Sequence, residues 1–342
     1  MNSRRLPAEW EPQSGAQLVW PRTMPFWENC MDRVEGCFAA IAREIARRET
    51  LIMACRNGRV TADALAMHGV NMAAVRLFEL EYDDAWSRDH GGITILEDGA
   101  PVILDFTFDG WGGKYASARD NALTERLHMA GAFGHTPLRP VPLTLEGGSI
   151  DVDGAGTMLT TSACLLHGHR NPHLDKTGVE SAIQESLGVD RVLWLEHGYL
   201  AGDDTDSHVD VLARFCARDA ITYVRCDDAG DEHYEALSAM ERELQSFRTR
   251  GGEPYVLHPL PWPDACYDGD GQRVPASYAN FLVINGAVLA PVYGVKQDED
   301  ALRALEGAFP GREIVPLDCS SLILEHGSLH CVTMQFPLGV EL

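Results

Sequence analysis

The chain contains 342 residues, of which 45% are hydrophobic, and it carries a formal net charge of −23 at pH 7. This negative charge argues against a nucleic-acid-binding protein, whose surface must be basic, and it favours a cationic small molecule as the partner. The sequence has no apolar run long enough to span a membrane, no secretory signal at its N-terminus and nine scattered cysteines without a Cys-x-x-Cys pair, so we expect a cytoplasmic protein with no membrane partner.

The first predicted elements belong to a unit that is divided between the two ends of the chain. Residues 16–21 (AQLVWP) have the pattern of a strand, and residues 331–337 (CVTMQFP) are expected to pair with them as a hairpin. A helix is predicted from about Cys30, because apolar residues then recur on one face, and residues 51–55 (LIMAC) follow as a strand. An additional helix and strand are expected within residues 62–80.

Four further units share one order, in which two strands joined by a tight turn precede a helix and a third strand. Asp98-Gly99, Asp153-Gly154 and Asn285-Gly286 are hairpin turn signals. The capping-box spacing of Thr177 and Glu180 predicts that the helix of the second of these units begins at Thr177. The expected hairpin strands are 92–96 with 101–106, 149–152 with 157–161, 209–215 with 220–226, and 281–284 with 287–292. The expected helices and third strands are 120–133 with 138–141, 177 onward with 191–195, 231–247 with 255–260, and 298–309 with 313–317.

Five such ββαβ units, the fifth formed by the N- and C-terminal segments, predict one α/β domain over residues 1–342. We expect a circular domain of radial repeats, similar in principle to a propeller, in which the units surround a common axis. The alternative is a doubly wound α/β sheet. The hairpin before each helix counts against it, because parallel strands require crossover connections.

Residues capable of chemistry stand at one equivalent place in these units, just ahead of or inside the first hairpin strand. Equivalent positions of a radial repeat converge around its axis, so residues that are far apart in the sequence would share one pocket. These residues are Asp89, Glu146, His208, Asp210, Asn280 and Cys331.

This set predicts nucleophilic attack on a guanidinium carbon. The Cys331 thiol needs a neighbouring base, which His208 can supply, with Glu146 orienting or charging the imidazole. Asp89 and Asp210 are not needed for this Cys–His chemistry. Two carboxylates beside a thiolate make a strongly anionic pocket, so we expect a cationic ligand. A planar guanidinium matches carboxylates through two hydrogen bonds at a time.

Each residue also has a purely structural interpretation. Cys331 could be a small buried hydrophobe, and Glu146 could only mark a tight turn. His208 and Asp210 alternate along a predicted strand and could form a buried polar pair. Arg88-Asp89 could be a surface ion pair.

Other motifs suggest weaker sites. The acidic run 203–210 could bind a divalent metal, although it lacks the glycine and the terminal glutamate of a calcium loop. The histidines of 167–173 (HGHRNPH) are expected in an exposed turn. Residues 110–114 (GWGGK) lack the spacing of a phosphate loop, and residues 153–158 (DGAGTM) do not open a helix as a dinucleotide fingerprint would.

Seven ordered motifs lie along nearly the whole chain. They are PAEWEPQSGAQLVWP, DDAWSRDHGGITI, LEGGSIDVDGAGTMLTT, RNPHL, GDDTDSHVDVLARF, YANFLVINGAVLAPVYG and HGSLHCVTMQ. Together they resemble the agmatine deiminase family, within the guanidine-modifying pentein superfamily and its bacterial peptidylarginine-deiminase-like branch. The resemblance implies the pentein fold, a five-bladed, pseudo-symmetric α/β propeller of ββαβ units. It also implies hydrolysis of agmatine to N-carbamoylputrescine and ammonia without a metal or cofactor.

By resemblance, Cys331 is the nucleophile that forms an amidino-cysteine intermediate, His208 is the general acid and base, and Glu146 is its acidic partner. Asp89 and Asp210 would grip the guanidinium. Trp86 falls in the motif that walls the substrate pocket. No residue is expected to ligate a metal.

The chain departs from the family in two motifs. It has EHGSLHC where many members have GGGNIHC, and RDHGG where they tend to have RDTGP. Both changes border the pocket, so the alternatives of free arginine or peptidyl-arginine as substrate stay open. A metal-dependent hydrolase that uses residues 203–210 and a cation-binding module without catalysis are further alternatives. The sequence permits a homo-oligomer without specifying one.

Overall fold

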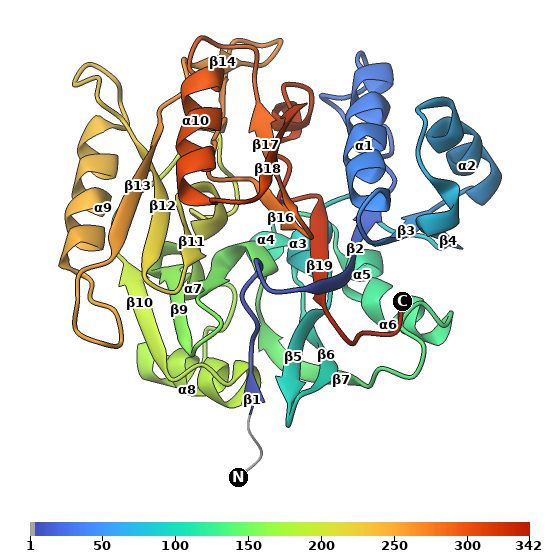
Figure 1. Ribbon diagram of the computed structural model, residues 1–342, viewed down its shortest axis with the longest axis horizontal. Coiled ribbons are helices and arrows are strands. Elements are labelled where there is room, and N and C mark those ends of the chain that lie inside the picture. Colours follow the sequence, from blue (N-terminus) through green and yellow to red (C-terminus); the bar gives the residue numbers. More distant parts are fainter. Residues whose placement is uncertain (1–3) are drawn as a thin grey trace.

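The computed structural model describes residues 4–342, and one of its sheets joins the two ends of the chain. β19 (Thr333–Pro337) pairs antiparallel with β2 (Gln13–Val19), so that Thr333 lies opposite Leu18. β3 (Thr50–Cys55) and β4 (Val75–Glu79) extend this sheet with parallel pairing. Figure 1 shows β19, in red, beside β2, in blue.

Helices make the crossovers that the parallel strands of this sheet require. α1 (Met31–Ala46) connects β2 to β3, and its apolar face, including Phe38 and Ile41, is fully buried. α2 (Gly58–Met67) connects β3 to β4, and the side chain of Asn57 caps its first turn.

The second sheet has the order β1-β5-β6-β7 and contains the first predicted hairpin. Asp98 and Gly99 both adopt positive φ angles, of 49° and 86°, as the tight turn requires. Residues 120–133 were predicted to form one helix, but the structure has two short helices there, α5 and α6. The elements are β1 (Arg4–Arg5), β5 (Ile93–Glu97), β6 (Ala100–Thr107), α5 (Ala118–Asn121), α6 (Leu123–Met129) and β7 (Leu138–Thr144).

The third sheet has the order β10-β9-β8, and its helix begins one residue earlier than predicted. The side chain of Asp175 accepts a hydrogen bond from the amide of Gly178, so Asp175, not Thr177, caps α8. The elements are β8 (Ile150–Val152), β9 (Thr157–Thr161), α7 (Ser162–Leu165), α8 (Lys176–Leu187) and β10 (Arg191–Leu195).

The two remaining large sheets repeat the order of an antiparallel hairpin and a parallel third strand. Their elements are β11 (Ala213–Ala217), β12 (Ala220–Arg225), α9 (Tyr234–Ser246), β13 (Val256–Pro261), β16 (Leu282–Ile284), β17 (Ala287–Val292), α10 (Asp298–Ala308) and β18 (Glu313–Asp318). β14 (Cys266–Tyr267) and β15 (Arg273–Val274) form a small ladder. The predicted mixed α/β class is confirmed.

Short helices and turns lie between these larger elements and carry many of the polar residues discussed below. Residues 209–211, predicted as the start of a strand, form one of these turns, and the strand begins only at Ala213. These segments are η1 (Met72–Ala74), α3 (Ser87–His90), α4 (Gly110–Gly113), η2 (Gly147–Ser149), η3 (Val209–Val211) and η4 (Leu322–Glu325).

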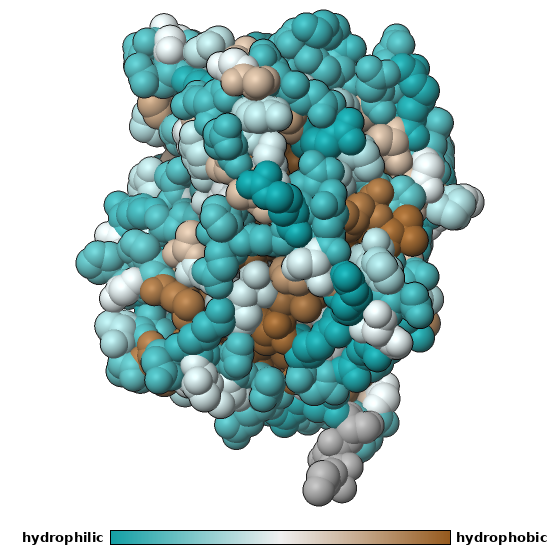
Figure 2. Space-filling view, turned by 90° about the vertical axis from the view of Figure 1, so that its left-hand side faces the viewer, coloured by the Kyte–Doolittle hydropathy of each residue, from teal (hydrophilic) through white to brown (hydrophobic). Residues whose placement is uncertain are grey.

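Hydrophilic residues cover most of the face in Figure 2, with smaller hydrophobic patches between them. No helix within residues 4–342 is both long and apolar enough to cross a membrane.

Candidate active site

One pocket gathers five of the six residues that were given catalytic or substrate-binding roles by resemblance, although they come from different parts of the fold. The pocket encloses about 540 Å³, part of it open to solvent. α3 and the residue before it, η3 and the residue before it, and the segment before β19 supply these side chains. The five are Trp86, Asp89, His208, Asp210 and Cys331.

Gly148 marks the point where three of these side chains meet. A Cβ atom placed there would lie 2.6 Å from His208 Nδ1, 2.8 Å from Asp89 Oδ1 and 3.1 Å from Asp210 Oδ2. The glycine amide uses this close approach to donate a hydrogen bond of 3.0 Å to Asp89 Oδ1. The turn predicted at Glu146-Gly147-Gly148 therefore also shapes the pocket.

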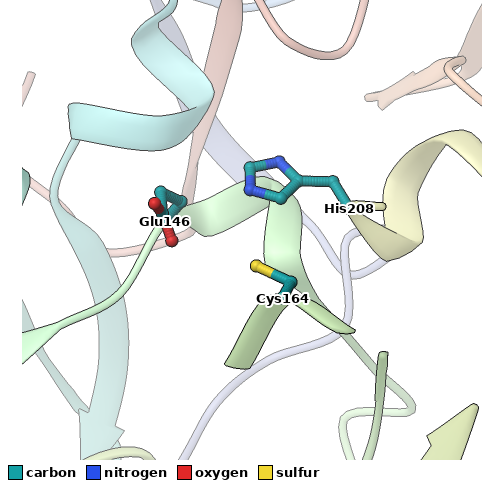
Figure 3. Close-up of side chains that lie close together, drawn as sticks. All are labelled: Glu146, Cys164 and His208. Atoms are coloured by element: carbon teal, nitrogen blue, oxygen red, sulfur yellow. The ribbon is translucent and has the colours of Figure 1, made fainter. Parts of the chain in front are cut away.

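Glu146, the sixth residue, lies behind the pocket and does not line it. Its carboxylate is fully buried and accepts hydrogen bonds of 2.8 and 3.0 Å from Arg170 Nε. Ligand atoms of Glu146, Cys164 and His208 lie within 4.8 Å of one another (Figure 3). Within residues 4–342 neither ring nitrogen of His208 has a hydrogen-bond partner, so Glu146 is near the imidazole without being bonded to it.

The Glu146, Cys164 and His208 cluster is a poor fit for a metal ion. Arg170 already neutralises Glu146, and its positive charge would repel a cation. Burial, followed by the charge of Glu146, raises the pKa of Cys164 well above its usual value near 9, which disfavours the thiolate that a metal requires.

Asp210 is held by a buried histidine. His330 Nδ1 lies 2.7 Å from Asp210 Oδ2, and His330 Nε2 lies 2.8 Å from Glu9 Oε2. Arg214 also pairs with Glu9. A hydrogen-bonded chain thus runs from the pocket through His330 into the protein interior.

The carboxyl groups of Asp210 and Asp89 differ in pKa because only Asp210 is hydrogen-bonded to His330. Burial opposes the ionisation of Asp210, but the hydrogen bond and charge of His330 outweigh it, so the pKa of Asp210 lies below its usual value. Burial and the charge of Asp210 raise the pKa of Asp89 well above its usual value.

The thiol and the imidazole are both uncharged in this environment at neutral pH. Burial, together with Asp210 and Asp89, raises the pKa of Cys331 well above 9. Burial lowers the pKa of His208 to about 3. Asn280 anchors the thiol, because its Oδ1 lies 3.4 Å from Cys331 Sγ and accepts a hydrogen bond of 2.9 Å from the amide of His330.

Two tryptophans shape the pocket, and only Trp86 was predicted. Trp111 donates a hydrogen bond of 2.9 Å from its indole Nε1 to Asp89 Oδ2. It adopts a positive φ of 58° within the glycine-rich α4, which is uncommon for a bulky residue and often marks a functional site. Gly327 packs so closely on Trp86 that an added Cβ would overlap the ring.

The acidic run 203–210 does not form a separate metal site, because protein donors already engage its carboxylates. Asp203 accepts hydrogen bonds from Thr205 and the amide of Ser207. Asp206 pairs with Lys114 and Arg170.

Several structural interpretations of single residues are wrong. Arg88 and Asp89 are buried and do not form a surface ion pair. His208 and Asp210 belong to the turn at η3 and do not alternate along a strand. In the segment 167–173, by contrast, His169 and His173 are exposed in a turn as expected, although Arg170 between them is buried against Glu146.

The mouth of the pocket is acidic. Within residues 4–342, its lining contains no lysine or arginine. Burial raises the pKa of Asp84 to about 7 and also raises the pKa of Glu325. Positively charged side chains of the protein therefore do not neutralise these two carboxyl groups. The carboxyl residues of the lining are Asp84, Asp89, Asp203, Asp204, Asp210 and Glu325. This arrangement suits a ligand with more than one positive charge.

Curated proteins similar to this chain are named agmatine deiminases. The one from Stutzerimonas stutzeri (strain A1501) is 33% identical over 355 residues, which cover 97% of this chain and 95% of the relative. A solved agmatine deiminase from C. jejuni with substrate bound has a TM-score of 0.89 at 33% identity and covers 98% of this chain and 96% of its own.

A solved structure from Porphyromonas gingivalis, provisionally named an arginine deiminase, is 48% identical. Its TM-score is 0.93, and the match covers 99% of this chain and 100% of that chain. The family model described as Porphyromonas-type peptidyl-arginine deiminase matches residues 5–337. The chain therefore belongs to the Porphyromonas-type peptidyl-arginine deiminase family.

Proposed function

We propose that this protein is an agmatine deiminase that hydrolyses agmatine to N-carbamoylputrescine and ammonia. The observation that carries the proposal is one pocket with a thiol, an imidazole and two carboxylates, and with an acidic mouth. The curated relatives named agmatine deiminase support the same activity.

The five large sheets are the blades of a propeller formed by one domain over residues 1–342. The repeated hairpin and parallel third strand support this arrangement, as does the pairing of β19 with β2, which would complete the fifth blade. The nine free cysteines favour a reducing compartment, the cytoplasm.

Asp89 and Asp210 bind the guanidinium of the substrate. Asp210 is ionised before the substrate arrives, and its Oδ1 atom is buried without a hydrogen-bond partner within residues 4–342. Asp89 loses its proton when the cation enters, because the positive charge offsets burial and the repulsion from Asp210. Trp86 and Trp111 form walls of the pocket.

Cys331 attacks the guanidinium carbon. The bound cation lowers the pKa of the thiol, which gives up its proton through His208 as the S–C bond forms. His208 then protonates the departing amino group, the C–N bond breaks, and ammonia leaves an amidino group on Cys331. Glu146, with Arg170, positions the imidazole from behind.

Water completes the reaction. His208 accepts a proton from the water that attacks the amidino carbon, and the C–S bond then breaks. The proton returns to the Cys331 sulfur, which releases the carbamoyl product and restores the thiol. This sequence consumes one water molecule and requires no metal or redox cofactor.

The acidic mouth selects the substrate tail. The second cation of agmatine, its primary amine, is attracted by Asp204 and Glu325, whereas the α-carboxylate of arginine would be repelled. The provisional name of the Porphyromonas gingivalis structure makes arginine the second candidate.

An ammonia-release assay with agmatine, free arginine and a blocked arginyl peptide tests the proposal. We expect agmatine to have the highest kcat/KM. We also expect Glu325→Gln to raise KM for agmatine while kcat changes little, because in this proposal Glu325 attracts the amine of the tail and not the guanidinium. The exposed Glu306→Gln variant is the matched control for loss of one carboxylate. A higher kcat/KM for either arginine compound would overturn the substrate assignment, and no turnover of any of the three would overturn the activity.

A further inference from the structure

A second pocket, the rear pocket, lies behind the active site and shares no lining residue with it. It encloses about 630 Å³, part of it open to solvent. The N-terminal segment at 6–9, β5, β8 and β19 contribute most of its walls. Apolar side chains, including Leu6, Ile93 and Met334, line much of the pocket.

Several buried polar atoms that face this pocket lack partners. Within residues 4–342, Arg88 Nη2, Thr94 Oγ1 and Gln13 Oε1 have no hydrogen-bond partner. All three residues line the rear pocket and are at most 6% exposed. Buried polar groups in native proteins normally have partners, so these atoms indicate a place that a ligand or water occupies.

Among the buried arginines of residues 4–342, Arg88 is the one without a close carboxylate partner. The other buried arginines, Arg170 and Arg214, each bind two carboxylates directly. Arg88 instead makes only long contacts with His330 O, at 3.5 Å, and Met334 Sδ, at 3.6 Å.

Within residues 4–342, every carboxylate that lines the rear pocket already has a hydrogen-bond partner. Glu9 is 4.0 Å away, and its oxygens already accept hydrogen bonds from Arg214, His330 and the amide of Val283. The other acidic residues of the rear pocket are likewise paired, Glu11 with Arg5 and Asp151 with Arg214. A buried guanidinium without a bonded counter-ion is costly, and an incoming anion would relieve that cost.

We propose that the rear pocket binds a small organic carboxylate with a short apolar tail. The carboxylate accepts hydrogen bonds from Arg88 and Thr94, while the tail packs among Ile93, Val152 and Met334. The amide oxygen of Gln13 needs a donor, which a bound water molecule supplies. The proposal does not rest on the proposed deiminase activity.

Binding of butyrate by the wild-type protein, with butanol and butylammonium as uncharged and charge-reversed controls, tests the ligand class. Calorimetry and 19F NMR with 4,4,4-trifluorobutyrate measure the affinity. We expect both controls to bind at least tenfold more weakly than butyrate. Equal binding of butanol would overturn the role of the charge, and stronger binding of butylammonium would overturn the ligand class.

Two variants and a crystal structure with butyrate test the location. We expect Arg88→Met and the near-isosteric Thr94→Val to weaken butyrate binding, whereas Thr61→Val, a buried threonine of α2, leaves it unchanged. Thr94→Val keeps the test valid if Arg88→Met does not fold. Butyrate beside Cys331, or full affinity in Thr94→Val together with density away from Arg88, would overturn the proposed site.

Discussion

His330 is bonded to Asp210 on one side and to Glu9 on the other, with a distance of 2.7 Å between His330 Nδ1 and Asp210 Oδ2. The histidine directly precedes Cys331 in the sequence, yet it does not line the active-site pocket, and its imidazole contacts Asp210. Burial opposes the ionisation of Asp210, and the contact with His330 is the main influence that keeps the pKa of Asp210 low. His330 is therefore a positioning residue for Asp210, the carboxylate that we propose receives the guanidinium.

His330→Gln should shift the pH dependence of agmatine hydrolysis. In the wild type the depressed pKa keeps Asp210 ionised down to low pH. Loss of the imidazole raises that pKa, so the acidic limb of kcat/KM moves to higher pH. Activity measured from pH 4 to 9 checks this, with the exposed His173→Gln as the control. An unchanged acidic limb in His330→Gln would show that Asp210 does not depend on His330.

Trp111→Phe should reduce kcat/KM for agmatine by about tenfold or more. The substitution keeps an aromatic ring but removes the hydrogen bond to Asp89, and hydrogen bonds to charged groups contribute about 1.5–3 kcal/mol. Trp194→Phe removes a comparable bond to Glu180, outside the pocket, and should leave the rate unchanged. Equal rates in the two variants would exclude a role for Trp111 in substrate binding.

Gly148→Ala should abolish activity while the protein stays folded. The added methyl group would collide with His208 and Asp89, which are part of the site, whereas Gly168→Ala meets no atom within 4 Å. Ammonia release and circular dichroism on both variants separate the two effects. Wild-type turnover by Gly148→Ala would mean that the three side chains do not need to converge there.

Cys331 should react slowly with iodoacetamide in the free enzyme at neutral pH. Its raised pKa keeps it a thiol, so alkylation should accelerate only above about pH 9. Asp210→Asn removes a negative charge and should increase the rate at pH 7. Mass spectrometry of the alkylated peptides measures the rate for each cysteine separately. Fast alkylation of wild-type Cys331 at pH 7 would contradict the proposed activation by the bound cation.

The hydrophobic pattern was sufficient to place most strands, because alternation and turn signals are local properties. Asp98-Gly99 is an example, since the residues that make the turn are the ones that mark it. The cap of α8 was misassigned because both Asp175 and Thr177 are good capping residues, and only the backbone shows which one is used.

Four residues that line the pocket, Asp89, His208, Asp210 and Cys331, were found because they stand at equivalent places in the units, and Trp86 was found by the resemblance of its motif. Arg170, Trp111 and His330 were missed as parts of the site, since their roles depend on long-range contacts. Arg170 lies among histidines that suggested an exposed turn, yet its guanidinium reaches the buried Glu146. The glycines around Trp111 were the available signal, because a bulky residue among several glycines often has an unusual backbone conformation.

Mass spectrometry of acid-quenched reactions with agmatine tests covalent catalysis most directly. We predict an amidino adduct on the peptide that contains Cys331 in the wild type, and less of it in His208→Asn, which lacks the acid and base of both steps. Cys164, equally buried and close to His208, serves as the internal control and should stay unmodified. Ammonia release with unmodified Cys331 in both proteins, or an adduct on Cys164, would contradict the proposed role of Cys331.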